Sequence, residues 1–228
     1  MSAHASSEAP PRLPKICFVV SAALTADAFL GDHIAALSKH YEVHLAANAG
    51  HEAMTHEALR RAIVHRIPVV RTISPWSDIR AIAKLTALLR RERFRAVHSL
   101  TPKAGLVSAL AGFLARVPVR IHTFTGQVWA TRSGAGRAML KGIDRAIATL
   151  NTHILVDSVS QRDFLRDQKV RPFVLDIETD STIQPDEQAE KQARTEFMQA
   201  FIRSDSADLK TGSQFDFSFS KLIDESCG

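Results

Sequence analysis

The amino-acid sequence predicts an α/β fold, a Rossmann-like parallel sheet with helices on both faces. Short apolar runs rich in β-branched residues alternate along the chain with longer segments whose apolar residues recur at helical spacing. The clearest apolar run is continuous and does not alternate with polar residues, so the sheet is expected to be covered on both faces. This regular alternation predicts parallel strands joined by right-handed crossovers.

The first third of the chain supplies three of the predicted strands. KICFVVS at 15–21 is continuously apolar and predicts a buried strand. EVHLAA at 42–47 and the run at 63–69 predict two more, separated by a polar turn and a short helix. A helix is expected over 27–39 because its apolar residues fall along one face; they are Phe29, Leu30, Ile34 and Leu37.

The middle of the chain continues the same pattern. A helix is predicted over 77–91, with a buried face formed by Ile79, Ile82, Leu85, Leu88 and Leu89. The helix at 103–115 is rich in small residues, and Gly105 and Gly112 are expected to let it approach the sheet closely. The other predicted elements are strands at 95–99, 119–124 and 154–156 and helices at 136–151 and 160–167.

Composition changes abruptly near residue 170. Residues 1–170 carry 23 Lys and Arg against 12 Asp and Glu, whereas residues 171–228 carry 6 against 12. We therefore expect a disordered leader over 1–14, a Rossmann-like domain over 15–170 and an unrelated acidic tail over 171–228. A helix is expected within this tail at about 186–201, directly after Pro185.

The basic body is compatible with a solvated surface, a membrane-surface patch or a nucleic-acid site. No nucleic-acid motif accompanies it and aromatic residues are sparse, so we expect no nucleic-acid partner. No apolar run approaches the length of a membrane span, and residues 1–12 lack the apolar core of a secretory signal. With only Cys17 and Cys227, the composition favours a reducing, cytoplasmic location.

Polar residues gather where two neighbouring strands are expected to end. In open parallel sheets, ligands bind outside the carboxyl ends of the strands, and hydroxyl, amide and ammonium groups suit hydroxyl-rich or phosphorylated ligands. The sequence therefore predicts a substrate-binding site formed by Ser99, Thr101, Lys103, Thr123, Thr125, Gly126 and Gln127.

Each of these residues also has a structural interpretation. Lys103 would either face an anion at a helix start or be a surface cation. Thr125 or Gln127 would hydrogen-bond a sugar hydroxyl or only stabilise the turn, in which Gly126 is expected to permit either a positive φ or a close approach of the backbone. His98 and His122 lie within strands, where packed core residues are more common than acids or bases.

The segments HSLTPKAG at 98–105 and VPVRIHTFTG at 117–126 resemble the N-terminal domain of family 4-like bacterial glycosyltransferases of the GT-B fold. FLGDHIAAL at 29–37 and VDSVSQRDFL at 156–165 extend the resemblance over about 15–170. One departure is Thr125 before Gly126, where many members have His. The resemblance implies one GT-B half, with Asp32 and His33 as further candidates that line the acceptor cleft.

The resemblance also implies a function: transfer of a hexosyl-type sugar from a nucleotide-sugar donor to a lipid-linked or saccharide acceptor. The product would be a surface polysaccharide such as lipopolysaccharide or capsule, made in the cytoplasm with peripheral contact to the inner membrane. The nucleotide sugar is a substrate, and no cofactor or metal is expected, since the His residues lack zinc-site spacing.

The acidic tail leaves three alternatives open. Residues 177–201 weakly resemble a segment of a tailed-phage portal protein and do not resemble a donor-binding domain. The chain would then be the acceptor-side half of a glycosyltransferase, a non-catalytic orphan binding module held by a partner that supplies the donor-binding domain, or a truncated or fused inactive product.

Overall fold

The computed structural model describes residues 13–70 and 74–170, which form a single six-stranded parallel sheet. The strand order is β3-β2-β1-β4-β5-β6. The strands are β1 (Lys15–Val19), β2 (Glu42–Ala47), β3 (Ile63–Arg66), β4 (Ala96–Leu100), β5 (Val119–Phe124) and β6 (His153–Val156). The α-helices are α1 (Ala23–Phe29), α2 (Gly31–Leu37), α3 (Pro75–Glu92), α4 (Pro102–Ala115), α5 (Gly134–Leu150) and α6 (Val159–Asp167). Two short 3-10 helices, η1 (His51–Ala53) and η2 (Glu57–Arg61), join β2 to β3.

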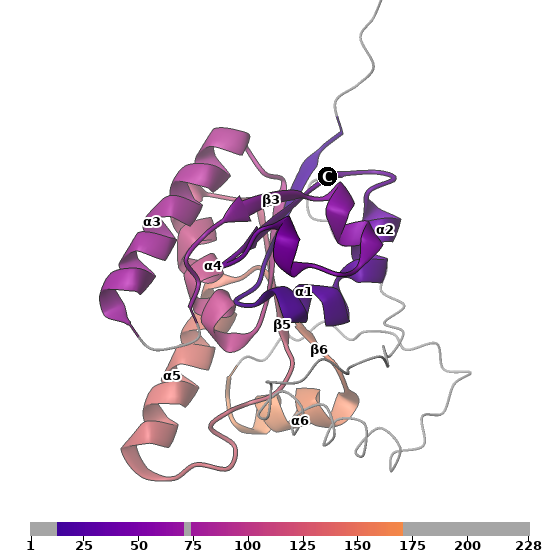
Figure 1. Cartoon of the computed structure of the whole chain (residues 1–228). Coiled ribbons are helices and arrows are strands. Elements are labelled where there is room, and N and C mark those ends of the chain that lie inside the picture. The colour runs from indigo at the N-terminus through magenta and orange to yellow at the C-terminus, as the bar shows by residue number, and fades with distance from the viewer. Residues whose placement is uncertain (1–12, 71–73, 171–228) are drawn as a thin grey trace, which may run out of the picture.

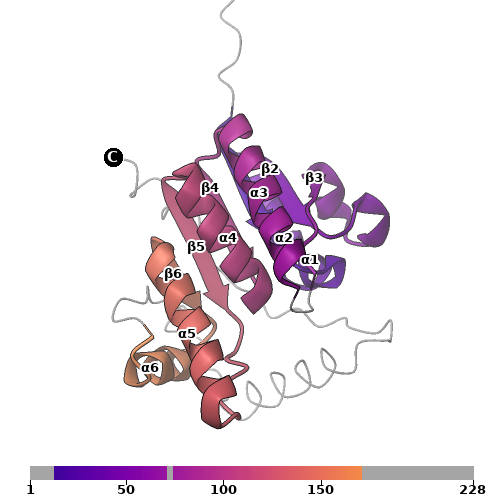
Figure 2. The same cartoon turned by 90° about the vertical axis from the view of Figure 1, so that its left-hand side faces the viewer.

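The helices form a layer on each face of the sheet. Helices α3, α4 and α5 lie side by side on one face, with α4 packed against both neighbours (Figure 2). Helices α1 and α2 cover the other face with η2, and α6 lies below β6 near the carboxyl edge of the sheet (Figure 1). The predicted fold class, a parallel sheet with helices on both faces, is confirmed.

Alternate residues of each strand build the core on opposite faces. In β1, Ile16 and Phe18 join the cluster beneath α1 and α2, whereas Cys17 and Val19 join the cluster beneath α3 and α4. All four are at most 1% exposed, as expected for a strand covered on both sides. Burial raises the pKa of the Cys17 thiol to about 12, so this thiol is an inert core group.

The helix expected over 27–39 is instead two short helices. The first ends at Phe29 and the second begins at Gly31, and Leu30 between them leaves ideal helical geometry with φ −110° and ψ −10°. Gly31 packs under the ring of His56, where an added Cβ would lie 2.5 Å from the ring. The sequence could not show this contact, because His56 comes from a loop on the far side of β2.

The predicted buried face of the helix at 77–91 is wrong at Ile79, which is 57% exposed. The buried arc of α3 is centred on Ala81, Leu85 and Leu88. At about 100° per residue, Ile79 lies roughly 120° away from Leu85 around the helix axis. The apolar stripe of α3 is therefore broader than the face that the sheet can cover.

The acidic segment at 171–228, the helix expected at about 186–201 and the portal-like stretch at 177–201 lie outside the described residues. The same holds for the expected leader apart from residues 13 and 14.

Candidate functional site

The strand order places a topological switch point between β1 and β4. These two strands are neighbours, yet the chain leaves β1 toward α1 on one face and leaves β4 toward α4 on the other. In such sheets the crevice between the two departing loops is the usual place for a ligand. The loops meet here through a hydrogen bond between the Ser21 and Thr101 hydroxyls, whose oxygens lie 3.2 Å apart.

Thr101 has an unusual backbone at this point. Its φ is +77° with ψ 139°, a conformation that residues other than glycine rarely adopt. Pro102 then begins α4, and the Gly105 amide donates to the Thr101 carbonyl at 2.8 Å. Such strain costs about 1–3 kcal/mol and is concentrated at ligand sites, so Thr101 is a strong candidate.

Lys103 lies in the first turn of α4, as expected, but its ammonium faces a carboxylate. Its Nζ lies 2.5 Å from Asp78 Oδ2 in the first turn of α3, and both side chains are mostly buried. Sequence reasoning missed Asp78, which lies 25 residues earlier on another helix. Any anion bound at Lys103 would therefore share that ammonium with Asp78.

Ser99 and Thr123 point to opposite faces of the sheet. Ser99 is fully buried on the α4 side, where its Oγ donates to the Ile121 carbonyl and lies 3.0 Å from His122 Nδ1. Thr123 is half-buried, and its Oγ1 lies 2.8 Å from His98 Nε2. Ser99 is thus a core residue beneath the site, whereas Thr123 lies closer to its rim.

Both strand histidines are core residues, in agreement with the sequence. Burial lowers the pKa of His122 to about 3 and holds the pKa of His98 well below its ordinary value. His33 on α2 and His122 on β5 add smaller electrostatic contributions that also lower the pKa of His98. Neutral imidazoles at this position can donate or accept hydrogen bonds but do not carry charge.

The loop after β5 holds Thr125, Gly126 and Gln127. Gly126 has φ +147°, which confirms the expected positive φ, and nothing lies within 4 Å of where a Cβ would be. Gln127 Oε1 accepts a long hydrogen bond of 3.4 Å from Gln161 Nε2 on α6. The carboxyl edge therefore brings Thr101, Lys103 and the β5–α5 loop to neighbouring strand ends.

The side chain of Asp32 is far more exposed than that of its neighbour His33. The Asp32 side chain is 95% exposed in the first turn of α2, and its Oδ1 lies 4.0 Å from His56 Nε2. The carboxylate of Asp27 has the more structural role, because its Oδ1 accepts from the amides of Thr55 and His56 at 2.9 Å. Asp27 thereby ties the loop after β2 to α1.

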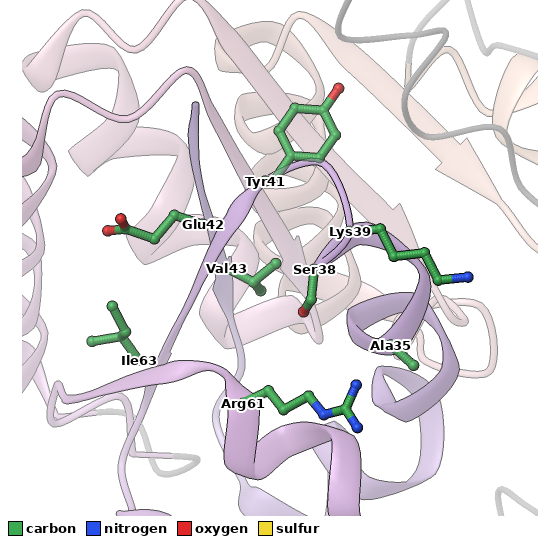
Figure 3. Close-up of a pocket in the computed structure, with 8 residues that line it drawn as sticks. All are labelled: Ala35, Ser38, Lys39, Tyr41, Glu42, Val43, Arg61 and Ile63. Carbon is green, nitrogen blue, oxygen red and sulfur yellow. The ribbon is translucent and has the colours of Figure 1, made fainter. Parts of the chain in front are cut away.

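A surface pocket of about 310 Å³ lies at the opposite end of the strands (Figure 3). It is formed where β2 and β3 begin, and the cations of Lys39 and Arg61 line one side. The Glu42 carboxylate points away and is engaged by Lys15 at 3.2 Å and His44 at 2.8 Å. Switch-point geometry, hydroxyl groups and backbone strain all favour the carboxyl edge over this pocket.

Two further findings concern the described ranges 13–70 and 74–170. No group of three or more His, Cys, Asp or Glu side chains is arranged there to hold a metal ion. No helix in the same ranges is long and apolar enough to cross a membrane.

The decisive comparison is with protein families. Residues 27–175 match the model of the glycosyl transferase 4-like domain, and this range covers most of the sheet and every predicted site residue. The chain belongs to this family. The resemblance carried by HSLTPKAG and VPVRIHTFTG is confirmed.

Similar proteins agree with this assignment. The capsular polysaccharide biosynthesis glycosyltransferase CapM of Staphylococcus aureus is 31% identical over 122 residues, which are 54% of this chain and 31% of CapM. The chain therefore spans about a third of the length of that relative. A crystal structure of UDP-N-acetylglucosamine 2-epimerase shares the fold, with a TM-score of 0.54 at 14% sequence identity. The match covers 72% of this chain and 48% of the epimerase chain.

Proposed function

We propose that this domain is the acceptor-side half of a hexosyl-type glycosyltransferase. It would serve the transfer of a sugar from a nucleotide-sugar donor to a lipid-linked or saccharide acceptor in the synthesis of capsule or lipopolysaccharide. The observation that carries the proposal is the family match over a sheet whose switch point holds the strained Thr101. The 31% identity to a capsular polysaccharide glycosyltransferase supports the class of product.

The chain's own residues suit acceptor binding at the carboxyl edge. Thr125 and Gln127 supply hydroxyl and amide groups that can hydrogen-bond sugar hydroxyls. The first turn of α4, which begins at Pro102, presents backbone N–H groups beside the Lys103 ammonium, a combination that favours a phosphate or diphosphate. We propose that His33 and Asp32 extend this surface along α2.

In our proposal, binding of the nucleotide-sugar donor requires a second domain. In the GT-B arrangement that the sequence resembles, the nucleotide sugar is held mainly by a second domain that faces the acceptor side across a cleft. We propose that such a domain, from the same protein or from a partner, completes the active site. Charge that develops on the departing diphosphate would then be stabilised by cations and helix N-termini at the closed cleft.

The cellular setting follows from the acceptor. A lipid-linked acceptor would be reached at the cytoplasmic surface of the inner membrane, so we propose a cytoplasmic protein in peripheral contact with that membrane. The helix layer α3–α5 is the face that supports this proposal, because its exposed charges are cations.

The test is a titration of the ¹⁵N-labelled 228-residue chain, followed by amide NMR. The probes are UDP-glucose, UDP-N-acetylglucosamine and a short-chain polyprenyl diphosphate carrying one sugar. We expect the lipid-linked sugar to shift the amides of Thr101, Lys103, Ala104 and residues 125–127 and to saturate, with both nucleotide sugars at least tenfold weaker.

A pair of variants locates the binding site. Gln127→Ala should weaken the lipid-linked sugar, whereas Arg61→Gln, at the amino-edge pocket, should leave its affinity unchanged. Shifts confined to the pocket around Lys39 and Arg61, or tighter binding of the nucleotide sugars than of the acceptor, would refute the acceptor-side assignment.

A further inference from the structure

The turn that follows Gly126 contains a tryptophan whose burial is unusual for its position. Trp129 is only 1% exposed, although its neighbour Val128 is 49% exposed and the residues at 130–134 are largely exposed. Burying an indole at the centre of a surface turn orders that turn, because the ring can occupy only one cavity. Trp129 lies three residues after Gly126, in the loop assigned to the acceptor.

Two contacts hold the Trp129 ring from different helices. Its Nε1–H donates to Asp144 Oδ2 on α5 at 2.6 Å, and Asp144 is itself only 5% exposed. Its ring stacks on Phe164 of α6, with the centroids 5.4 Å apart and an angle of 22° between the planes. A buried hydrogen bond to a carboxylate is among the stronger polar contacts in proteins.

Two cations of α5 lie over the same indole. The Arg137 guanidinium is 5.7 Å and the Lys141 ammonium 5.4 Å from the ring centroid. Both donate to Gln168 Oε1 after α6, at 3.3 and 2.8 Å respectively. Burial and the neighbouring charges of Arg145, Arg137 and Lys169 lower the pKa of Lys141.

The other residues of the loop are held less firmly than Trp129. Gly126 adopts φ +147° with open space around it, so it permits the turn without defining it. The Gln127 side chain makes a long contact of 3.4 Å with Gln161. The Ala130 amide closes the turn by donating to the Gln127 carbonyl at 3.0 Å, and the short hydrogen bond at Trp129 attaches this turn to α5.

We propose that Trp129 and Asp144 are positioning residues: their buried hydrogen bond sets the conformation of residues 125–127 and so the shape of the acceptor site. This inference rests on the proposed function for its acceptor, whereas the positioning itself can be measured without any ligand. Neither residue touches the substrate in this proposal.

The first measurement is hydrogen exchange of the Ala130 and Arg132 amides in the full chain, because these amides close the turn by donating to the Gln127 and Trp129 carbonyls at 3.0 and 3.1 Å. Asp144→Ala and Trp129→Phe each remove one partner, and exchange at both amides should become about tenfold faster, as expected for one lost buried hydrogen bond. Asp144→Asn keeps an acceptor oxygen for the indole and should restore slow exchange. Leu85→Ala, in the fully buried face of α3, is the control for a general loss of stability.

The second measurement is the indole N–H resonance. The chain has two tryptophans, and Trp76 is 80% exposed, so the two signals are distinguishable. The Trp129 signal should follow the ionisation of Asp144 in the wild-type chain, and this titration should disappear in Asp144→Asn. A Trp129 signal that is independent of Asp144 would overturn the proposal.

Acceptor binding separates this inference from the proposed function. Weaker binding of the polyprenyl diphosphate sugar in Asp144→Ala, with recovery in Asp144→Asn, supports both. No binding by the wild-type chain contradicts the proposed function alone, because the exchange result still stands. Equal acceleration at the Ala130 and Arg132 amides in Leu85→Ala and Asp144→Ala would refute the positioning role.

Discussion

Thr101 has a strained backbone conformation and lies in the proposed acceptor site. Its φ is +77°, Pro102 follows it at the start of α4, and its hydroxyl oxygen lies 3.2 Å from that of Ser21. Thr101→Ala keeps the strained backbone and loses the hydroxyl, whereas Thr101→Gly relieves the strain. We expect Thr101→Gly to be more stable than Thr101→Ala by about 1 kcal/mol. Urea unfolding of the two variants tests this, and equal stabilities would mean that the backbone is not strained.

Asp144 predicts a pH dependence of stability. Burial is the main cause that raises its pKa to about 6, above its ordinary value of about 3.9, so the folded state disfavours the carboxylate. The unfolded chain therefore ionises first as the pH rises. The contribution of Asp144 to the free energy of unfolding is fully present below about pH 4. It declines between about pH 4 and pH 6 and stays low above pH 6.

The variant Asp144→Asn tests the direction of this pH dependence, because asparagine does not titrate. At 1.36 kcal/mol per pKa unit, and with the unfolded carboxyl already mostly ionised at pH 4.5, the difference in unfolding free energy between the variant and the wild-type chain should move in favour of the variant by about 2 kcal/mol from pH 4.5 to pH 8. Comparing the two pH values cancels any fixed effect of the amide. A difference that is constant with pH, or one that moves the other way, would exclude a raised pKa.

At single residues, the sequence correctly predicted the features that depend only on neighbouring residues in the chain. The positive φ of Gly126 and the core role of His98 and His122 follow from turn and strand rules alone. The ion pair of Lys103 could not be predicted from neighbouring residues, because its partner Asp78 lies on another helix. The link from Trp129 to Asp144 also escaped prediction, since nothing in the spacing shows that α5 folds back over its own preceding turn.

Helix α4 owes its close approach to the sheet to one glycine in particular. A Cβ at Gly105 would lie 2.5 Å from His122 Cε1, and His122 cannot retreat because its Nδ1 is bonded to Ser99 in the core. Gly105→Ala should therefore destabilise the domain by about 1–3 kcal/mol. Thermal or urea unfolding measures this.

Gly142 supplies the matched control on another helix. It lies in the interior of α5 with nothing within 4 Å of the position that an added Cβ would take, so the only effect of alanine is on the helix itself. Gly142→Ala should stabilise the domain by about 0.5–1 kcal/mol. If both substitutions moved stability in the same direction, packing against His122 would not explain the small residue in α4.

At the scale of elements, the sequence predicted every strand and most helices. The strands at 42–47 and 119–124 agree at both ends with β2 and β5. The failures are long-range in origin: α1 and α2 separate at Leu30 beside the packing of Gly31 on His56, and Ile79 lies outside the arc that the sheet covers. Periodicity locates a helix but does not show which neighbours will bury it.

At the scale of the whole molecule, the helix layer α3–α5 of the described residues exposes cations, whereas its carboxylates are paired or buried. In the layer α3–α5, Asp78 is paired with Lys103, Glu92 with Lys15 and Asp144 is buried. The same layer exposes the basic side chains of Arg80, Lys84, Arg90, Arg91 and Arg145. Near the start of α3, Trp76 and Ile79 add exposed apolar surface. This combination suits the headgroup region of an anionic bilayer.

Vesicle binding tests this face, with Trp76 as an internal probe. We expect the chain to sediment with phosphatidylcholine vesicles that contain 30% phosphatidylglycerol, and binding to fall as salt rises. Trp76 fluorescence should shift to the blue on binding, while the buried Trp129 contributes a constant signal. Arg80→Glu with Lys84→Glu should reduce binding at least tenfold, since each cation near such a surface contributes about 1 kcal/mol.

The control carries the same change of charge on the opposite layer. Arg60→Glu with Arg61→Glu alters two exposed cations of η2, which packs with α2 on the other face of the sheet. This variant should keep most of its binding if α3 faces the bilayer. Equal losses in both double variants would mean that net charge alone drives the association. Equal binding to pure phosphatidylcholine would exclude an electrostatic contact and, with it, the membrane orientation proposed for this domain.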